Sequence, residues 1–277
     1  MKQNERVTGK EQYYTPHNTA LFCFNKMKPF LPTNHEFTWL EPAGGTGSFI
    51  DVIENNGFNN IISYDIEPKH QKVLLTKDFL LEDISHLNNC ITLTNPPFGR
   101  ANKLSIPFFN KVAKVSTLIG FLVPKSWRKW SVINRLDLNF HLVEDVDLDV
   151  DFIYETPQTK SKGRLNTIFQ VWERREHKRD KIVIEDRKYI TKTTPENADV
   201  SLTIFGRGCG KVKTNFERVP NTTQMFLKLN ESWVLDALNQ VNFSRFYNNV
   251  AFVEALSIQE INYLLNEYID SRSVDVY

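Results

Sequence analysis

The sequence predicts an α/β protein: a main domain built on a mostly parallel sheet with an antiparallel hairpin at one edge, followed by a small C-terminal domain. Short apolar segments alternate with helical segments over residues 37–123, and a glycine-rich turn joins the first of these strands to a helix. Strands that alternate with helices form parallel sheets covered on both faces, with right-handed crossovers. After Trp172 the sequence changes to a charged run, so we expect a first domain at residues 1–180 and a second at 181–277. A chain of 277 residues, 41% of them hydrophobic, is long enough for both.

The first predicted elements are a helix, a strand and a second helix. Thr15 and Pro16 are of the types preferred at an N-cap and a first helical position, and the helix that they begin ends before Pro29. The apolar segment 37–41 is the first strand, and the helix after the glycine turn begins at Ser48. We expect four more strands at residues 61–65, 73–75, 90–94 and 118–123, and one helix at 108–115.

The edge hairpin and the C-terminal domain follow. Residues 146–152 alternate acidic and apolar side chains, residues 168–172 are largely apolar, and a polar loop around 156–164 joins them. In the second domain we expect a glycine-punctuated strand pair at 203–212. A closing helix begins with the capping box Ser257 to Glu260.

Composition excludes several classes of protein. No segment approaches the ~20 apolar residues that span a bilayer, and residues 1–12 are too polar for the core of a signal peptide. We therefore expect a cytoplasmic protein without a membrane partner. The three cysteines lie far apart and the six histidines have no ligand spacing, so neither a disulfide framework nor a metal site is expected.

A glycine turn, Gly45-Thr-Gly47, follows the first strand, where backbone can approach a ligand at the start of a helix. The third glycine of the dinucleotide fingerprint is missing, which argues against NAD, and no Gly-Lys-Ser/Thr follows, which excludes a P-loop. Glu41 precedes the turn, and Asp65 ends the second strand. An acid at the second position bonds ribose hydroxyls, and an acid beside the turn suits a cationic amino group. The combination indicates S-adenosylmethionine, with a purely structural turn as the alternative.

The sequence Asn95-Pro96-Pro97-Phe98 follows an apolar strand. Two prolines fix the backbone and remove two donors where the strand ends, so the turn presents acceptors. Asn95 adds a side-chain carbonyl, and Phe98 offers a flat apolar surface. Such a group can accept hydrogen bonds from an exocyclic amine while it stacks on the ring that carries the amine. A rigid turn with a core phenylalanine is the structural alternative.

These motifs resemble those of the S-adenosylmethionine-dependent DNA adenine-N6 methyltransferases, in the subgroup whose cofactor motifs come first and whose target-recognition region comes last. The resemblance covers roughly residues 12–175. Its motifs are Tyr14-Thr-Pro16, Glu41-Pro-Ala-Gly-Gly-Thr-Gly-Ser-Phe49, Asp65, Asp78-Phe79 and Asn95-Pro-Pro-Phe98. It implies a Rossmann-like sheet of the class I methyltransferase type, a target-recognition role for residues 181–277, and activity as a site-specific enzyme of the restriction–modification kind.

The resemblance also implies which residues form the site. The cofactor would be held by Thr15, Pro16, Glu41, Ala43, Gly45, Gly47, Phe49, Asp65, Asp78 and Phe79, and the catalytic motif would be Asn95, Pro96, Pro97 and Phe98. Thr15 and Pro16 would meet the carboxylate end of the methionine. Asp65 would take the ribose hydroxyls, with Glu67 as a competing candidate. Asp78-Phe79 would contact the adenine.

The implied reaction is direct displacement, in which acceptors at Asn95 and the Pro96 carbonyl localise the lone pair of the attacking amine. An adenine in duplex DNA must be flipped out of the helix to reach such a pocket. Residues 160–192 hold 11 basic and five acidic side chains, a local charge of 11 − 5 = +6, which suits phosphate. The expected nucleic-acid contacts are Lys125, Arg128, Lys129, Lys160, Lys162, Arg164, Arg207 and Lys211. Whether the enzyme is a monomer or a dimer is left open.

Other functions are compatible with the same motifs. The same chemistry could methylate adenosine in RNA or the amide of a protein glutamine, since an Asn-Pro-Pro-aromatic turn also serves planar amides. In a different class, the chain would be a non-catalytic nucleic-acid-binding module or subunit with a methyltransferase fold.

Overall fold

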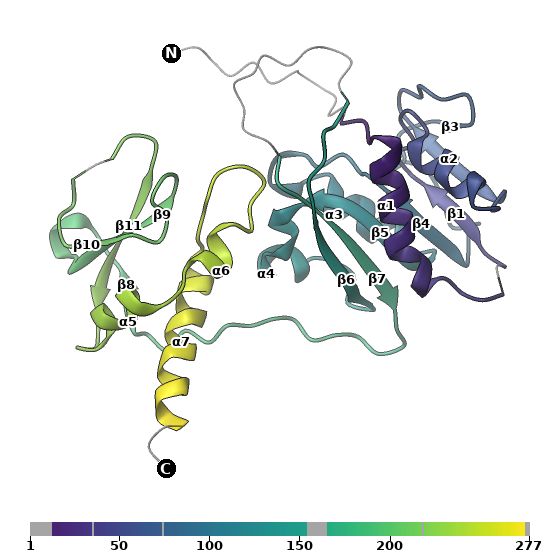
Figure 1. Ribbon diagram of the computed structural model, residues 1–277. Coiled ribbons are helices and arrows are strands. Elements are labelled where there is room, and N and C mark those ends of the chain that lie inside the picture. The colour runs from purple at the N-terminus through teal and green to yellow at the C-terminus, as the bar shows by residue number, and fades with distance from the viewer. Residues whose placement is uncertain (1–12, 35, 74, 154–164, 218, 275–277) are drawn as a thin grey trace. The chain divides into compact units, whose positions relative to one another are not determined.

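The computed structural model describes residues 13–34, 36–73, 75–153, 165–217 and 219–274 (Figure 1). The chain divides into two compact units, Met1–Lys181 and Ile182–Tyr277, which are described separately below. Among the described residues, no helix has the length and apolar composition needed to cross a membrane.

The described strands of the first unit form one seven-stranded sheet, in the order β3-β2-β1-β4-β5-β7-β6. Its strands are β1 (Thr38–Glu41), β2 (Ile61–Asp65), β3 (Leu75–Thr76), β4 (Cys90–Thr94), β5 (Ser116–Pro124), β6 (Phe140–Leu148) and β7 (Thr167–Arg174). Neighbours from β3 to β5 are parallel, whereas β7 is antiparallel to both β5 and β6. The chain order reverses between β1 and β4. In open α/β sheets, ligands bind outside the carboxyl ends of the strands at this switch point.

Helices cover both faces of this sheet. They are α1 (His17–Met27), α2 (Ser48–Asn55), α3 (Ser105–Val112) and the short α4 (Trp130–Ile133). Successive side chains of a strand point to opposite faces, and β1 shows the result. Trp39 packs against Phe24 of α1, with ring centroids 5.9 Å apart, whereas Leu40 joins the core cluster that contains Phe109 of α3. The sheet is therefore buried on both sides, which explains the five consecutive buried residues of β4.

Some predicted boundaries shift. The first helix begins at His17, so Pro16 rather than Thr15 occupies the N-cap position, and no side chain caps this helix. The third strand is Leu75–Thr76 instead of 73–75, and the helix predicted at 108–115 spans Ser105–Val112. This helix tolerates Pro107 because the proline lies in the first turn, where its missing N–H has no helical acceptor. The edge hairpin is confirmed, although β6 begins at Phe140 rather than at 146.

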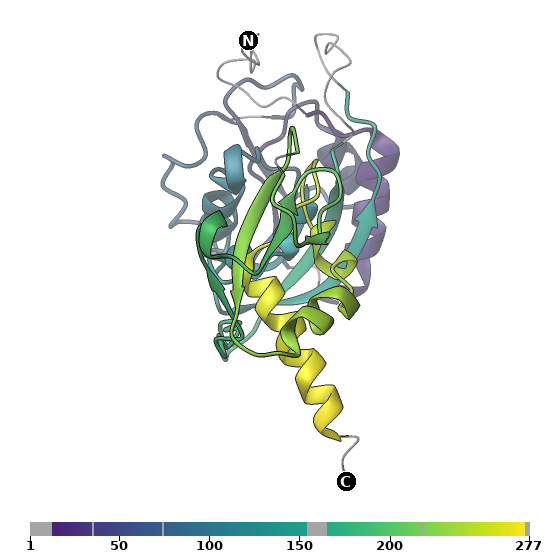
Figure 2. The same ribbon diagram turned by 90° about the vertical axis from the view of Figure 1, so that its left-hand side faces the viewer.

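The second unit is an antiparallel sheet packed against helices (Figure 2). The strand order is β10 (Val212–Lys213), β9 (Val200–Phe205), β11 (Thr223–Leu229) and β8 (Ile190–Lys192). The helices are α5 (Val234–Gln240), α6 (Ser244–Tyr247) and α7 (Ile258–Val274). The predicted capping box is present, because Glu260 N–H donates to Ser257 Oγ and a Glu260 carboxylate oxygen accepts from Ser257 N–H.

Candidate active site at the carboxyl edge of the sheet

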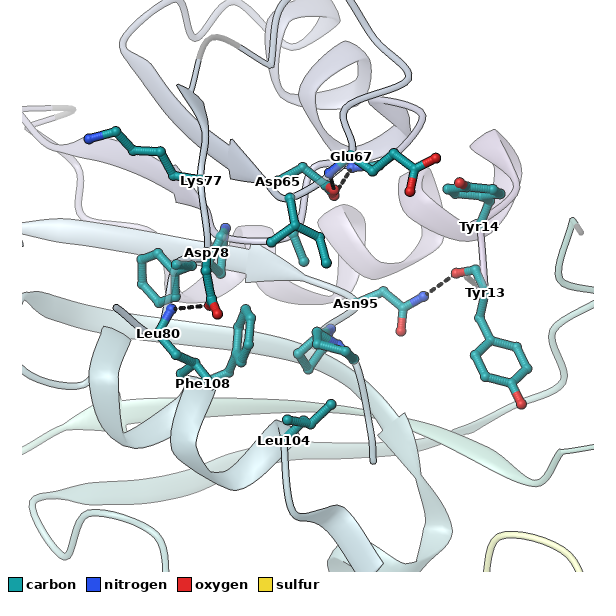
Figure 3. Close-up of a pocket in the computed structure, with 17 residues that line it drawn as sticks. Tyr13, Tyr14, Asp65, Glu67, Lys77, Asp78, Leu80, Asn95, Leu104 and Phe108 are labelled. Carbon is teal, nitrogen blue, oxygen red and sulfur yellow. Dashed lines mark hydrogen bonds between the residues drawn. The ribbon is translucent and has the colours of Figure 1, made fainter. Parts of the chain in front are cut away.

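A cavity of about 300 Å³ opens where β1, β2 and β4 end (Figure 3). It lies at the switch point of the sheet, and each parallel strand around it contributes the residues that follow its last position. The lining residues are Tyr13, Tyr14, Pro42, Ala43, Gly45, Asp65, Ile66, Glu67, Lys77, Asp78, Phe79, Leu80, Asn95, Pro96, Pro97, Leu104 and Phe108. The structure thus brings the glycine turn, the acid after the second strand and the Asn-Pro-Pro motif into one cavity.

The turn after β1 requires its glycines. Gly45 has φ +50° and Gly47 φ +80°, in the left-handed region that favours glycine. A Cβ at position 45 would lie 3.2 Å from the ring of Tyr14, and one at position 47 would collide with the ring of His70. Backbone therefore forms this wall of the cavity, and the N–H of Gly45 is held by a 2.8 Å hydrogen bond to Asp65 Oδ2.

Glu41 lies beneath the turn rather than in the cavity wall and is only 1% exposed. One of its carboxylate oxygens accepts hydrogen bonds from Thr94 Oγ1, at 2.5 Å, and from the N–H of Ala43, at 3.0 Å. Burial raises the pKa of Glu41 to about 8, because the charged form loses its hydration. This carboxyl group ties the end of β1 to the end of β4.

The two acids that compete for the ribose position have different surroundings. Both oxygens of Asp65 accept backbone hydrogen bonds, from Gly45 N–H and, at 2.7 Å, from Glu67 N–H. Glu67 lies on the cavity wall, with Lys69 Nζ 2.9 Å from its Oε1. Asp65 therefore shapes two segments of the wall, whereas the Glu67 carboxylate forms an ion pair with Lys69.

The segment after β3 forms another wall. Asp78 lines the cavity and accepts a 3.0 Å hydrogen bond from the N–H of Leu80. Phe79 also lines it but is 1% exposed, packed edge-on against Tyr64 and tilted against Phe108. The ammonium group of Lys111 lies 5.1 Å from the centre of the Phe79 ring. This aromatic wall is consequently rigid.

Asn95 has an unusual hydrogen-bond environment. Its Nδ2 donates to the main-chain oxygen of Tyr13 at 2.7 Å and to Thr15 Oγ1 at 3.1 Å, and Figure 3 shows the amide turned toward Tyr13. Its Oδ1 is buried and has no hydrogen-bond partner in the described part of the chain. A buried carbonyl oxygen without a donor is uncommon in native structures and suggests a missing ligand donor.

Phe98, the aromatic residue of the Asn95-Pro-Pro-Phe98 motif, lies beside the cavity rather than in its wall. Phe98 is 6% exposed, and its ring stacks on Tyr13, with centroids 5.7 Å apart and planes 30° from parallel. Tyr13 in turn lines the cavity and packs edge-on against Phe152. Phe98 therefore meets the cavity through the tyrosine ring that covers it.

Sequence reasoning missed several cavity residues, namely Tyr13, Ile66, Lys77, Leu80, Leu104 and Phe108, while Tyr14 and Glu67 had been singled out. Tyr13 could have been found from its position, because it directly precedes Tyr14, the first residue of the Tyr14-Thr-Pro16 motif. Other predicted residues, Thr15, Pro16, Glu41, Gly47, Phe49 and Phe98, support the cavity without lining it. The predicted residues that line the cavity are Ala43, Gly45, Asp65, Asp78, Phe79, Asn95, Pro96 and Pro97.

The predicted nucleic-acid contacts fall into four groups. Lys125 and Arg128 form ion pairs with acids of β6, at 2.7 Å to Asp147 and 2.5 Å to Asp145. Arg207 and Lys211 are exposed on the loop after β9. Lys129 lies at the end of the 3₁₀ turn Lys125–Arg128. The remaining predictions, Lys160, Lys162 and Arg164, lie outside the described residues. Within the described ranges, no cluster of His, Cys, Asp and Glu could hold a metal ion.

No protein-family model and no curated protein matches the sequence. Among solved structures, the chain is similar to a candidate RNA methyltransferase, PH1948 from Pyrococcus horikoshii, at 16% identity and a TM-score of 0.43, over 62% of this chain and 90% of that one. A candidate class I S-adenosylmethionine-dependent methyltransferase from Listeria monocytogenes is also 16% identical, with a TM-score of 0.43, over 66% of each chain. The M protein of the type I restriction enzyme EcoKI is 17% identical, with a TM-score of 0.42, over 60% of this chain and 45% of that one.

The architecture itself defines the class of fold. Parallel strands in the order β3-β2-β1-β4-β5, extended by the antiparallel β7 and then β6, form the Rossmann-like sheet of the class I methyltransferase type. The predicted fold class is therefore confirmed.

Proposed function

We propose that this protein is an S-adenosylmethionine-dependent methyltransferase that methylates the exocyclic N6 amine of adenine in DNA. The observation that carries the proposal is the buried Oδ1 of Asn95, which has no hydrogen-bond partner among the described residues; Asn95 lines the same cavity as Gly45 and three carboxylates. An acceptor of this kind is satisfied by the N–H of a substrate amine.

The lining of the cavity suits S-adenosylmethionine. Asp65, Glu67 and Asp78 supply acceptors for hydroxyl and amino groups and negative charge for a cationic ligand. The backbone at Gly45 leaves room for the amino-acid part of the cofactor. A volume of about 300 Å³ lies at the lower end of the ~300–1,000 Å³ typical of small-molecule sites.

The cofactor supplies a methyl group on a sulfonium, which is an excellent leaving group. Transfer would form an N–C bond as the S–C bond breaks, with the thioether of the cofactor as leaving group, and the proton lost by the nitrogen would pass to solvent water. Asn95 Oδ1 and the Pro96 carbonyl accept hydrogen bonds from the amine, which localises its lone pair toward the methyl group. Orientation at near-attack distance contributes most of the remaining acceleration, up to ~7–11 kcal/mol in well-ordered systems. Neither a covalent nucleophile nor a strong base is required.

A flipped adenine would enter beside Tyr13 and Phe98, whose stacked rings offer aromatic surface at the cavity. Stacking of this type contributes about 1–3 kcal/mol per base, which offsets part of the few kcal/mol needed to extrude it. Arg207, Lys211 and Lys129 are the proposed phosphate contacts, with the second unit as the target-recognition region.

The direct test is methyl transfer from labelled S-adenosylmethionine by the full-length chain, offered duplex DNA, single-stranded DNA, RNA and a protein substrate. Digestion of the product to nucleosides or amino acids identifies the acceptor, and N6-methyladenine from DNA is expected. Asn95→Ala serves as the control, because it should keep cofactor binding and lose turnover. Label recovered in RNA adenosine or in a glutamine amide would replace the proposed substrate. Cofactor or nucleic-acid binding without transfer to any substrate would favour a non-catalytic module.

A further inference from the structure

We propose that the segment Tyr13–Thr15 is a positioning element, which holds the Asn95 side-chain amide in the one orientation that presents Oδ1 to the substrate. This inference rests on the proposed function and adds to it a role for the Tyr13 main-chain oxygen and for the Thr15 side chain. Thr15 is 5% exposed and is not part of the cavity wall.

The hydrogen bonds determine the orientation of the amide. A main-chain carbonyl has no proton to donate, so the end of the Asn95 amide that lies 2.7 Å from the Tyr13 oxygen must be the NH₂ group. Rotating the amide by 180° would bring two oxygens together at that distance. Thr15 Oγ1 accepts from the same nitrogen at 3.1 Å. Two acceptors thus hold Nδ2, and Oδ1 is left for the substrate.

The positioning segment is itself held from two sides. Tyr14 forms a two-way backbone bridge with Ile153, in which Tyr14 N–H donates to Ile153 O at 3.1 Å and Ile153 N–H donates to Tyr14 O at 2.9 Å. The main-chain oxygen of Thr15 accepts a 2.6 Å hydrogen bond from Ser48 Oγ, at the first residue of α2. Because both flanks are fixed, the Tyr13 oxygen and the Thr15 hydroxyl form a rigid pair of acceptors.

This geometry gives Thr15 a different role from the one that the family resemblance implies. Substituting a residue that binds the cofactor would lower the affinity for the cofactor. Substituting a residue that positions Asn95 would lower the rate of methyl transfer from the bound complex. Without the Thr15 hydroxyl, the Asn95 NH₂ group would keep only one of its two acceptors, the Tyr13 oxygen, so the orientation of the amide would be held less tightly.

The test compares Thr15→Val, which removes the hydroxyl at nearly constant volume, with Thr15→Ser, which keeps it. Thr19→Val is the matched control, because Thr19 is also buried, in α1, and does not bond to Asn95. Two quantities are measured for each variant: the dissociation constant for S-adenosylmethionine, and the single-turnover rate of methylation at saturating cofactor. We expect Thr15→Val to lower the rate at least tenfold with cofactor affinity within about twofold of the native value. Thr15→Ser should restore most of the rate, and Thr19→Val should change neither.

Weaker cofactor binding with an unchanged rate at saturation would overturn the inference in favour of a cofactor contact, and a native rate and affinity in Thr15→Val would overturn it outright. A second measurement is independent of turnover. The side-chain NH₂ resonances of Asn95, assigned by their loss in Asn95→Asp, should shift and exchange faster with water in Thr15→Val. If the native protein methylates nothing, the proposed function fails, and these resonances alone decide whether Thr15 holds the amide.

Discussion

The side-chain nitrogen of Asn95 lies 2.7 Å from the main-chain oxygen of Tyr13, although 82 residues separate the two in the sequence. This contact joins the segment before α1 to the turn after β4, and both line the same cavity. The nitrogen of the Asn95 amide is therefore held in place, whereas its oxygen has no hydrogen-bond partner among the described residues.

The first prediction concerns the donor side of this amide. Asn95→Asp is almost isosteric, but a carboxylate cannot donate to the Tyr13 oxygen and would face it as a second acceptor. We expect the single-turnover rate of methylation to fall at least a hundredfold and the free energy of unfolding to fall by about 1–3 kcal/mol. Chemical denaturation and rapid-quench transfer assays measure the two effects.

Asn110→Asp is the matched control. Asn110 Nδ2 donates to the oxygen of Arg135 and its Oδ1 accepts from the N–H of Asp137, and Asn110 is not among the residues that line the cavity. This variant should lose some stability and keep its rate at saturating substrates. Equal losses of rate in both variants would mean that the effect is a general consequence of destabilisation.

Much of the cavity could be predicted from the sequence because its motifs directly follow apolar strands. The glycine turn and Asn95 come directly after β1 and β4, and Asp65 is the last residue of β2. The carboxyl ends of neighbouring parallel strands lie together. Recognising the strands was therefore enough to predict that these motifs lie together at the carboxyl edge of the sheet.

The remainder could not be predicted, since it depends on groups that leave no pattern in the sequence. The Tyr13 acceptor is a main-chain oxygen, which every residue has. The ion pairs of Lys125 and Arg128 depend on the register of β6, which begins six residues before the alternating segment that predicted it. The hydroxyl of Thr15 accepts a hydrogen bond from Asn95 and does not cap α1. This choice of partner also depends on the tertiary structure.

The second prediction tests the glycine turn. Gly45→Ala places a side chain at φ +50°, a left-handed conformation that costs about 1–2 kcal/mol for alanine, and puts its Cβ 3.2 Å from the Tyr14 ring on the cavity wall. We expect the affinity for S-adenosylmethionine to fall about tenfold or more, measured by calorimetry. Gly57→Ala has a similar backbone strain at φ +89° but open space around its Cβ, so it should lower stability and leave affinity unchanged. Native affinity in Gly45→Ala would show that the cofactor does not approach this turn.

The third prediction separates Asp65 from Glu67. Asp65→Asn should lower both the melting temperature and cofactor affinity, because an amide cannot accept from both Gly45 and Glu67 N–H groups through two oxygens. Glu67→Gln should lower affinity several-fold with little change in melting temperature, since its carboxylate lies on the cavity wall. Unchanged affinity in Glu67→Gln would assign the ribose hydroxyls to Asp65.

The fourth prediction concerns the proposed contacts with DNA. Arg207 is exposed and has no ion pair with any described residue, whereas Lys125 is neutralised by Asp147 at 2.7 Å. Arg207→Ala should therefore weaken DNA binding on all sequences and reduce the slope of log affinity against log salt by about 1. Lys125→Ala should change that slope less. Fluorescence anisotropy over a range of salt concentrations measures both, and a larger effect of Lys125→Ala would place the phosphate-binding surface on the first unit instead.

The last prediction follows from the raised pKa of Glu41. Burial raises it from an ordinary value of 4.5 to about 8, so between these pH values the folded protein retains a proton that the unfolded chain has lost. The free energy of unfolding must then decrease as pH rises through this window, by at most ~1.4 kcal/mol per pH unit for one group, and level off above about pH 8.

Glu41→Gln has no proton to lose in this range and can still accept from Thr94 and the N–H of Ala43 through its carbonyl oxygen. Denaturation at pH 5 and at pH 8 should show the native protein losing more stability than this variant over the interval. Glu36→Gln, at an exposed position just before β1, should follow the native curve. If the stability of Glu41→Gln shows the same dependence on pH as that of the native protein, Glu41 is already ionised in the folded protein at pH 5. The ammonium group of a bound cofactor would then meet a permanent negative charge beneath the glycine turn.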